Sequence, residues 1–152
     1  MNALELLIDD HQKVAQLFEQ AEETENEKEK QNLFEQIKAE LETHTHIEET
    51  IFYPALREHE ELEDIVLEAF EEHKQVKTLL REISELADGS EKFDAKLKVM
   101  KENIEHHVDE EEGEMFPQVE DLIDEDELEQ LGTKMEAAKK QFNKGASSAS
   151  AR

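Results

Sequence analysis

The sequence predicts an all-α protein: an antiparallel up-down-up-down four-helix bundle with a short additional C-terminal helix. The 152 residues include only four Gly and two Pro and are rich in Glu, Leu, Lys, Ala and Gln, a composition that favours helices. Apolar residues recur with helical spacing in four segments of roughly 20 to 30 residues. Because short turns separate these segments, antiparallel neighbours are the simplest arrangement.

Capping residues and helix breakers give the expected boundaries of the four long helices. They predict a first helix from Asn2 to about residue 23, a second from near Asn26, a third over roughly 61 to 87, and a fourth from Ser90. Asn2 followed by Glu5 is typical of a capping box. The third helix should end at "ADGS", where Gly89 suits the C′ position. Pro54 and Pro117 should kink or end the second and fourth helices.

The C-terminal part of the chain is expected to add one shorter helix and a tail. Residues 124–143 carry apolar side chains at helical spacing, namely Leu128, Leu131, Met135 and Phe142, and predict a helix for packing or for a partner. The small residues that follow predict a disordered tail. We therefore expect a helical bundle over 1–143 and a disordered tail over 144–152.

The charge and composition exclude several classes of function. Seventeen basic residues against 42 acidic residues give a formal net charge of −25. Such a chain repels nucleic-acid backbones and anionic lipid, so neither nucleic acid nor membrane is an expected partner. The absence of Cys excludes disulfides and thiolate metal sites. With no signal sequence and no long apolar stretch, a cytoplasmic protein is expected.

The chain repeats itself, which groups its histidines. "DDHQKVAQLF" (9–18) aligns with "EEHKQVKTLL" (71–80), and "HTHIEETIFYP" (44–54) aligns with "HVDEEEGEMFP" (107–117). The matched pairs are His11 with His73, His44 with His107, Glu48 with Glu111, and Pro54 with Pro117. Both halves therefore predict the same pair of helices, which together bring four His and two Glu to equivalent places.

Helical geometry decides which histidine of each neighbouring pair should face the core. His44 continues the apolar line of its helix, whereas His46 lies about 160° away and should face outward. His107 is preferred over His106, because the alternative pair His106–Glu110 lies off the apolar line. In each half the chosen His and the Glu four residues later share one face of the helix.

Six such polar groups in an apolar bundle point to metal ions. Buried carboxylates without partners would be very costly, and two divalent or trivalent cations would remove that cost. Imidazole suits iron, copper, nickel or zinc, and a carboxylate can bridge two hard ions. Helix bundles with inward Glu and His one turn apart are a recurring scaffold for paired metals. The alternative, a set of hydrogen-bonded core histidines, does not account for the repeat-related positions.

The stretches "DDHQKV", "HTHIEETIFYPAL", "EEHKQVKTLL" and "HHVDEEEGEMFPQV" resemble a hemerythrin-like (HHE cation-binding) domain over roughly residues 2 to 120. The resemblance implies a four-helix bundle with a non-haem, oxo- or hydroxo-bridged di-iron centre and a small diatomic or peroxide ligand. The ligands that it implies are His11, His44, Glu48, His73, His107 and Glu111. Glu48 and Glu111 would be the bridging carboxylates.

One position departs from the oxygen-carrying members of that family. They have a second His one turn after the first in the third helix, and here that position is Lys77. The loss of a ligand would open a coordination position, which favours sensing or redox handling of peroxide, oxygen or nitric oxide over reversible oxygen carriage.

Two further side chains are open candidates for the site. Tyr53 could bind an open iron position if the adjacent proline rotates the backbone, but an ideal helix turns it about 180° from His44 and predicts packing at the rim. Glu49 could serve as an extra or exchanging carboxylate.

Three functions therefore remain as hypotheses. The first is a di-iron protein that binds or senses a small oxidant, and the second is an iron-dependent redox enzyme that acts on peroxide or nitric oxide. The third is iron storage or donation, or the holding of a partner by the 124–143 helix.

Overall fold

The computed structural model describes residues 1–86 and 90–150, with side chains through residue 145. Within these ranges the chain is helical and contains no strand. The five long helices are α1 (Ala3–Glu23), α2 (Glu27–Ile47), α4 (Glu63–Ser84), α5 (Glu91–Glu110) and α7 (Glu125–Ser150). Short elements connect them: π-helix η1 (Glu48–Phe52), α3 (Tyr53–Leu56), 3-10 helix η2 (Glu60–Leu62), π-helix η3 (Glu111–Met115) and α6 (Phe116–Leu122).

The predicted helix starts are confirmed by their capping contacts. The side chain of Asn2 accepts a hydrogen bond from the Glu5 backbone N–H, and the Glu5 side chain accepts one from the Asn2 N–H, which completes a capping box. Asn26 caps α2 and Ser90 caps α5 by accepting backbone N–H groups in the same way. Gly89, the expected C′ residue of the third long helix, lies outside the described residues.

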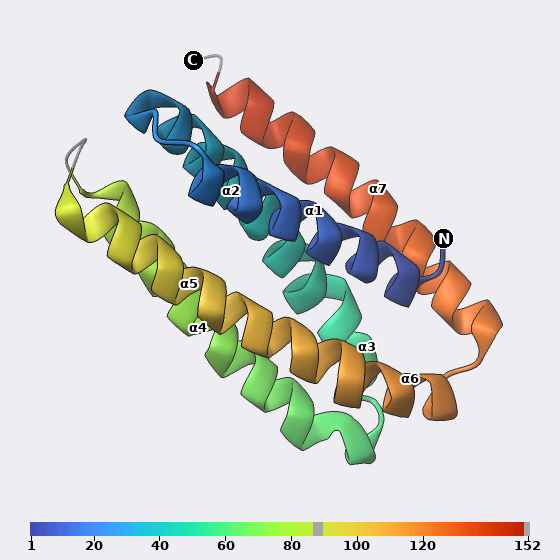
Figure 1. The fold of residues 1–152 in the computed structure, drawn as a ribbon. Coiled ribbons are helices and arrows are strands. Elements are labelled where there is room, and N and C mark those ends of the chain that lie inside the picture. The colour runs from blue at the N-terminus through green and yellow to red at the C-terminus, as the bar shows by residue number, and fades with distance from the viewer. Residues whose placement is uncertain (87–89, 151–152) are drawn as a thin grey trace.

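Four of the five long helices lie side by side in two pairs (Figure 1). The chain turns back after α1 so that α2 lies along it, and α5 lies along α4 in the same manner. The buried apolar side chains form two clusters. On each of these four helices one buried His, at position 11, 44, 73 or 107, falls between the residues of one cluster and those of the other. The polar centre is therefore enclosed between two apolar layers.

The C-terminal helix is longer than the sequence predicts. α7 has 26 residues and lies along α1 and α2, and it buries Leu128, Leu131 and Met135 in the core. Gly132 allows this close approach, because a Cβ there would overlap the backbone of the first residues. The helix also continues to Ser150, into the segment predicted as a disordered tail from residue 144. Residues 151–152 lie outside the described chain.

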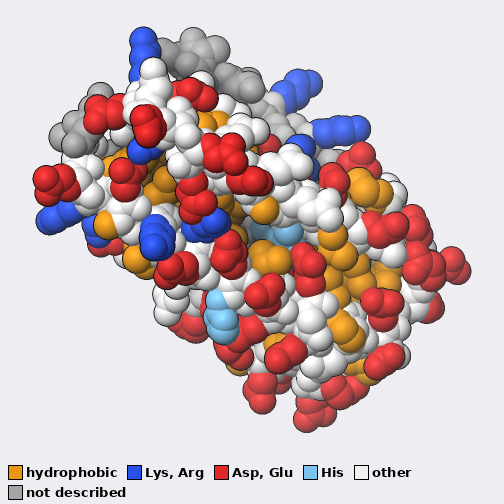
Figure 2. All heavy atoms as spheres, in the orientation of Figure 1, with side chains coloured by type: hydrophobic (Ala, Val, Ile, Leu, Met, Phe, Trp, Pro, Cys, Tyr) orange, Lys and Arg blue, Asp and Glu red, His pale blue; other side chains and the backbone are white. Residues whose placement is uncertain are grey.

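The surface is mostly acidic. Carboxylate side chains are spread over the face seen in Figure 2, whereas Lys and Arg gather in fewer places. None of the helices in the described ranges is both long enough and apolar enough to cross a membrane.

Candidate metal centre

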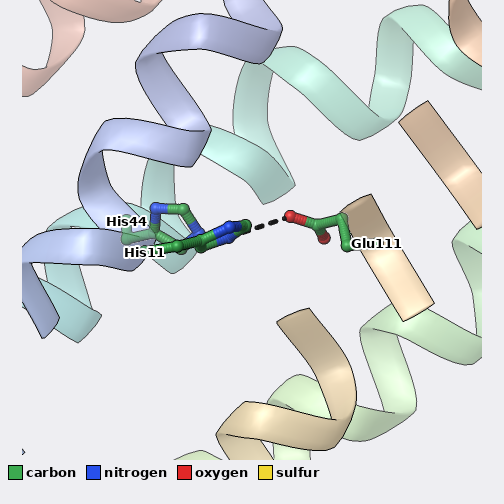
Figure 3. Close-up of side chains that lie close together, drawn as sticks. All are labelled: His11, His44 and Glu111. Carbon is green, nitrogen blue, oxygen red and sulfur yellow. Dashed lines mark ion pairs between the residues drawn. The ribbon is translucent and has the colours of Figure 1, made fainter. Parts of the chain in front are cut away.

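Six buried side chains meet between the two apolar clusters, and they are the six that the repeat singles out. His11 comes from α1, His44 from α2, His73 from α4 and His107 from α5, while Glu48 and Glu111 are the first residues of η1 and η3. None is more than 8% exposed. Their ligand atoms form two groups within which all atoms lie within 4.8 Å of one another: His11, His44 and Glu111, and Glu48, His73 and His107. Figure 3 shows the first group.

The two carboxylates each contact imidazoles of both groups. Glu48 Oε1 lies 3.0 Å from His44 Nε2 and 3.2 Å from His73 Nε2. Glu111 Oε1 lies 3.2 Å from His11 Nε2, and its Oε2 lies 3.1 Å from His107 Nε2. Each carboxylate therefore lies between the two groups of imidazoles.

The inner atoms of this cluster lack the hydrogen bonds that burial normally requires. Six buried atoms have no hydrogen-bond partner among the described residues: His11 Nε2, His44 Nε2, His107 Nε2, both oxygens of Glu48, and Glu111 Oε1. The nitrogens lie 3.0–3.2 Å from carboxylate oxygens, which makes ion pairs only when the imidazoles are protonated. Leaving so many buried polar atoms unpaired would cost several kcal/mol. Cations between these nitrogen and oxygen atoms would satisfy them, so the residues present fit a pair of metal ions.

The outer nitrogen of each imidazole is held by a carboxylate. The Nδ1–H of His11 donates to Glu112 (2.6 Å), that of His44 to Asp10 (3.0 Å), that of His73 to Glu49 (2.7 Å) and that of His107 to Glu72 (2.8 Å). A carboxylate on Nδ1 fixes the ring orientation and leaves Nε2 free to bind a metal, the arrangement common to metal-binding histidines. All four rings are therefore oriented with Nε2 toward the centre.

Asp10, Glu72 and Glu112 were not expected as site residues, although the repeat contains the signal. Asp10 and Glu72 precede matched histidines, and Glu49 and Glu112 follow matched glutamates. Glu49 and Glu112 each bind a histidine of the other half of the repeat: Glu112 accepts from His11, and Glu49 accepts from His73. Glu49, expected as a candidate extra ligand, contacts His73 Nδ1 and Lys77 instead.

Lys77 turns away from the centre. Its Nζ lies 2.9 Å from both oxygens of Glu49, and its side chain is half exposed. Lys77 and the His73 ring together hold the pKa of Glu49 below its usual value, although burial opposes them. Lys77 thus fixes the Glu49 carboxylate, which in turn orients His73. It offers no ligand atom to the buried cluster.

Tyr53 faces the centre, which corrects its expected place at the rim. Its side chain is fully buried. Its hydroxyl group donates a hydrogen bond to Glu111 Oε2 at 2.7 Å, and the hydroxyl oxygen of Tyr53 also lies 3.3 Å from His73 Nε2. The reason is η1: the Tyr53 N–H bonds the Glu48 carbonyl five residues back. A π-helical turn takes up one extra residue, so Tyr53 reaches the face that position 52 would occupy in an ideal helix.

The second half makes the same turn but ends in a different side chain. In η3 the Phe116 N–H bonds the Glu111 carbonyl, and Phe116 occupies the position equivalent to Tyr53. Its ring stacks against His11, with centroids 6.4 Å apart and planes 8° apart. The phenol of Tyr53 therefore contacts Glu111 of one group and His73 of the other, whereas the equivalent Phe116 places only a hydrocarbon ring beside His11.

The neighbouring histidines take the outward places that helical geometry predicts. His46 is exposed and stacks on Phe142 of α7. The His106 side chain is 68% exposed and lies 3.0 Å from Glu110, so the alternative inward pair His106–Glu110 does not form.

Without metal, the cluster holds protons. Burial opposes charge on His44, but the Glu48 carboxylate and the hydrogen bond to Asp10 outweigh it and raise the pKa of His44 to about 10. Burial also opposes charge on His107, whose pKa is raised to about 11 by Glu111 and Glu72. Contacts with His107 and His11 hold the pKa of Glu111 well below its usual value in spite of its burial. Imidazolium–carboxylate pairs therefore occupy the place of cations in the metal-free protein.

The sequence matches the hemerythrin HHE cation-binding domain family over residues 2–119. The chain belongs to this family. The expected resemblance is thus confirmed, and the family match ends at residue 119, before α7 begins.

Two known proteins are similar to this HHE domain. The crystal structure of a hemerythrin HHE cation binding domain-containing protein from Mycobacterium kansasii superposes with a TM-score of 0.82 and 31% identity, covering 96% of this chain and 90% of that one. A protein of Nostoc sp. named DNA nickase is 27% identical over 139 residues. The match covers 91% of this chain, but only 39% of the Nostoc protein.

Proposed function

We propose that the protein is a non-haem di-iron protein that binds or senses a small oxidant such as oxygen, peroxide or nitric oxide. The proposal is carried by one observation: the unpaired buried Nε2 and carboxylate atoms that face one another inside the bundle. One ion would be held by His11, His44 and Glu111 and the other by His73, His107 and Glu48, with both carboxylates bridging at the middle of an antiparallel four-helix bundle. Bound iron would supply electron exchange with the oxidant.

The space beside the cluster supports a small ligand. A cavity of about 30 Å³ touches all four inward histidines and is otherwise lined mainly by apolar side chains, Val14, Leu41, Val76, Ile104 and Val108 among them. This is about the share of one water molecule in the liquid, which suits a diatomic molecule or peroxide. A groove of about 450 Å³ between α1 and α5 reaches His11 and offers access from solvent.

The test is to load metal-free protein with ferrous iron without oxygen, remove excess iron, and then admit oxygen, peroxide or nitric oxide. We expect about two iron ions per chain and a change in near-ultraviolet absorption on exposure to the oxidant, as is typical of di-iron carboxylate proteins. Protein that retains no iron above background would contradict the proposal.

An enzyme acting on peroxide or nitric oxide is the second candidate, because Lys77 leaves open a position that a histidine would fill. The chain's own residues support such a role by keeping the four imidazoles oriented and by surrounding the cluster with apolar side chains. Turnover assays with each oxidant separate the two candidates, since a sensor reacts once whereas an enzyme exceeds free iron over many cycles.

Iron storage or donation fits the geometry less well. Every proposed ligand is buried, and each imidazole is fixed by a second carboxylate, so release would require several contacts to break together. Slow loss of iron to a strong chelator would agree with this, and rapid loss without any oxidant reactivity would favour storage.

The similarity to the protein named DNA nickase does not support a nickase activity for this chain, because the chain spans only 39% of that protein. A formal charge of −25 also opposes contact with a phosphate backbone. We expect no relaxation of supercoiled plasmid by the iron-loaded protein, measured by gel electrophoresis alongside free iron as a control.

A further inference from the structure

A second set of possible metal ligands lies on the outer side of α4 and α5. Glu72, His106 and Glu110 each present a ligand atom within 4.8 Å of the others, and His106 Nε2 lies 3.0 Å from Glu110 Oε1. One imidazole and two carboxylates suit a divalent first-row cation, and the exposure of His106 leaves the group open to solvent.

A small acidic pocket joins this outer group to the inner centre. Its volume is about 40 Å³, and it is lined by Glu68, Glu72, Glu110 and Glu114 with His107 and Glu111. Glu111 is 1% exposed and its Oε1 has no hydrogen-bond partner among the described residues. The lining contains no Lys or Arg from the described chain. The pocket could hold about one water molecule or a partly dehydrated cation.

Glu72 belongs to both the outer group and the inner centre. Its Oε1 accepts the Nδ1–H of His107 at 2.8 Å, and it also offers an oxygen to the outer group. A cation bound outside would therefore lie one carboxylate away from a ring whose Nε2 faces the centre.

The other half of the repeat has no such opening. Thr43 and Ile47 occupy the positions equivalent to His106 and Glu110, and α7 covers them, with the Thr43 hydroxyl bonded to Asn143. Asp10, the equivalent of Glu72, is 2% exposed and binds Lys139. A lysine ammonium thus occupies the place where a cation would approach, whereas the equivalent place on the α4–α5 side is lined by carboxylates and by no described Lys or Arg.

We propose that Glu72, His106 and Glu110 form an outer cation site that captures ferrous iron from solution and passes it through the acidic pocket to the inner centre. This inference rests on the proposed function, since it assumes that the inner residues bind iron. The capture is by ligand exchange alone, so the ion keeps its charge and oxidation state. The field of the four surface carboxylates raises the local concentration of cations at the pocket.

The rate of iron uptake tests the outer site. Metal-free full-length protein is mixed with limiting ferrous iron without oxygen, and unbound iron is followed with a colorimetric chelator. We expect the double variant His106→Gln and Glu110→Gln to take up iron about five-fold or more slowly than wild type. It should reach the same final content, because the inner residues are intact. Co²⁺ titration should show one weak equivalent in wild type that this variant lacks.

The matched control is His59→Gln with Glu58→Gln, in the turn after α3. It removes the same two side-chain types and the same formal charge away from the pocket, and we expect uptake within two-fold of wild type. Equal uptake rates in the outer-site variant and wild type would overturn the outer site alone. A lower final content in a variant with unchanged circular dichroism would also overturn it, because the residues would then belong to the centre. Wild type that holds no iron would remove the proposed function as well.

Discussion

At the scale of single residues, the four imidazoles differ from ordinary core histidines in the different surroundings of their two ring nitrogens. Each Nδ1 donates to a carboxylate, and each Nε2 faces the centre. A core histidine kept only for packing would need a partner for Nε2 as well. This difference makes the six inner residues testable one at a time.

Glu111→Gln should lower iron content and heat stability together. The amide keeps the shape of the side chain but removes the charge that faces His11 and His107. We expect about one iron ion per chain or fewer, and loss of most of the rise in melting temperature that bound iron gives, because a ligand stabilises only the fold that binds it. Iron analysis and melting with and without iron measure both effects.

Glu105→Gln is the control for that substitution, since Glu105 is exposed on α5, the helix that leads into η3. It should retain wild-type iron content. If Glu111→Gln also keeps its full iron content and its iron-dependent stabilisation, Glu111 is not a ligand.

Tyr53→Phe should destabilise the metal-free protein. The hydroxyl donates to Glu111, so its removal leaves a buried carboxylate oxygen with one contact fewer. Burial and the nearby Glu111 and Glu48 carboxylates raise the pKa of Tyr53 well above its usual value, so the phenol stays protonated and remains a donor. We expect a loss of about 1–3 kcal/mol in the free energy of unfolding, measured by urea denaturation. Unchanged stability would show that the hydrogen bond contributes nothing.

At the scale of elements, the π-helices explain what the sequence could and could not predict. The His–Glu spacing of four is preserved, because the Glu48 N–H still bonds the His44 carbonyl, and so the inner six residues follow from periodicity. After Glu48 the turn widens, and an ideal helix no longer places Tyr53 correctly. The proline after each π-helix lacks an N–H and would clash with the preceding turn of a regular helix. It is therefore the local signal in the sequence that the helix just before it departs from α-helical geometry.

The role of α7 at the centre could be predicted only in part from the sequence. Its apolar residues predict packing, but the contact of Lys139 with Asp10 depends on how the helix docks and leaves no pattern in the sequence. Through Asp10 this helix holds the outer nitrogen of His44. Burial opposes charge on Asp10, but His44 and Lys139 together lower its pKa, so the carboxylate stays ionised.

Lys139→Met should therefore loosen one side of the centre. The substitution keeps the side-chain length and removes the charge, which leaves the buried Asp10 carboxylate with His44 alone. Because Lys139 is partly exposed, we expect a modest loss of about 1–3 kcal/mol in the free energy of unfolding of the metal-free protein. Iron-loaded variant should also lose iron to a chelator faster than wild type.

Lys140→Met is the matched control, because Lys140 is the next residue along α7 and is exposed. It should leave both stability and the rate of iron loss unchanged. Equal effects from the two substitutions would mean that the charge of α7 matters in general and that the contact with Asp10 does not.

At the scale of the whole molecule, the repeat gives the centre an approximate two-fold symmetry that the rest of the chain breaks. Each half supplies two histidines to one group of ligands and its glutamate to the other. The matched sequences predicted that these six residues meet, but not which glutamate joins which pair of histidines. Two differences break the symmetry. Tyr53 against Phe116 is visible in the aligned sequences, whereas the contact of Lys139 with Asp10 arises from the docking of α7 and could not be derived from the repeat.

The proton content of the centre gives a prediction for the whole protein. In the metal-free state the folded pKa values are about 10 for His44 and about 11 for His107, against 6.5 for an ordinary histidine. Groups whose pKa is raised by folding stabilise the fold fully below their unfolded pKa, and this stabilisation is lost as the pH rises toward the folded value. The melting temperature of the metal-free protein should therefore fall between about pH 7 and pH 10.

Iron should remove most of that pH dependence, because a bound imidazole is neutral and its Nε2 carries no proton. We expect the melting temperature of iron-loaded protein to change little over the same range, and iron uptake near pH 8 to release protons into weakly buffered solution. Melting curves at several pH values and a pH-indicator dye measure the two effects. Metal-free protein whose stability rises toward pH 10, or uptake without proton release, would mean that the imidazolium–carboxylate pairs do not hold the centre before iron does.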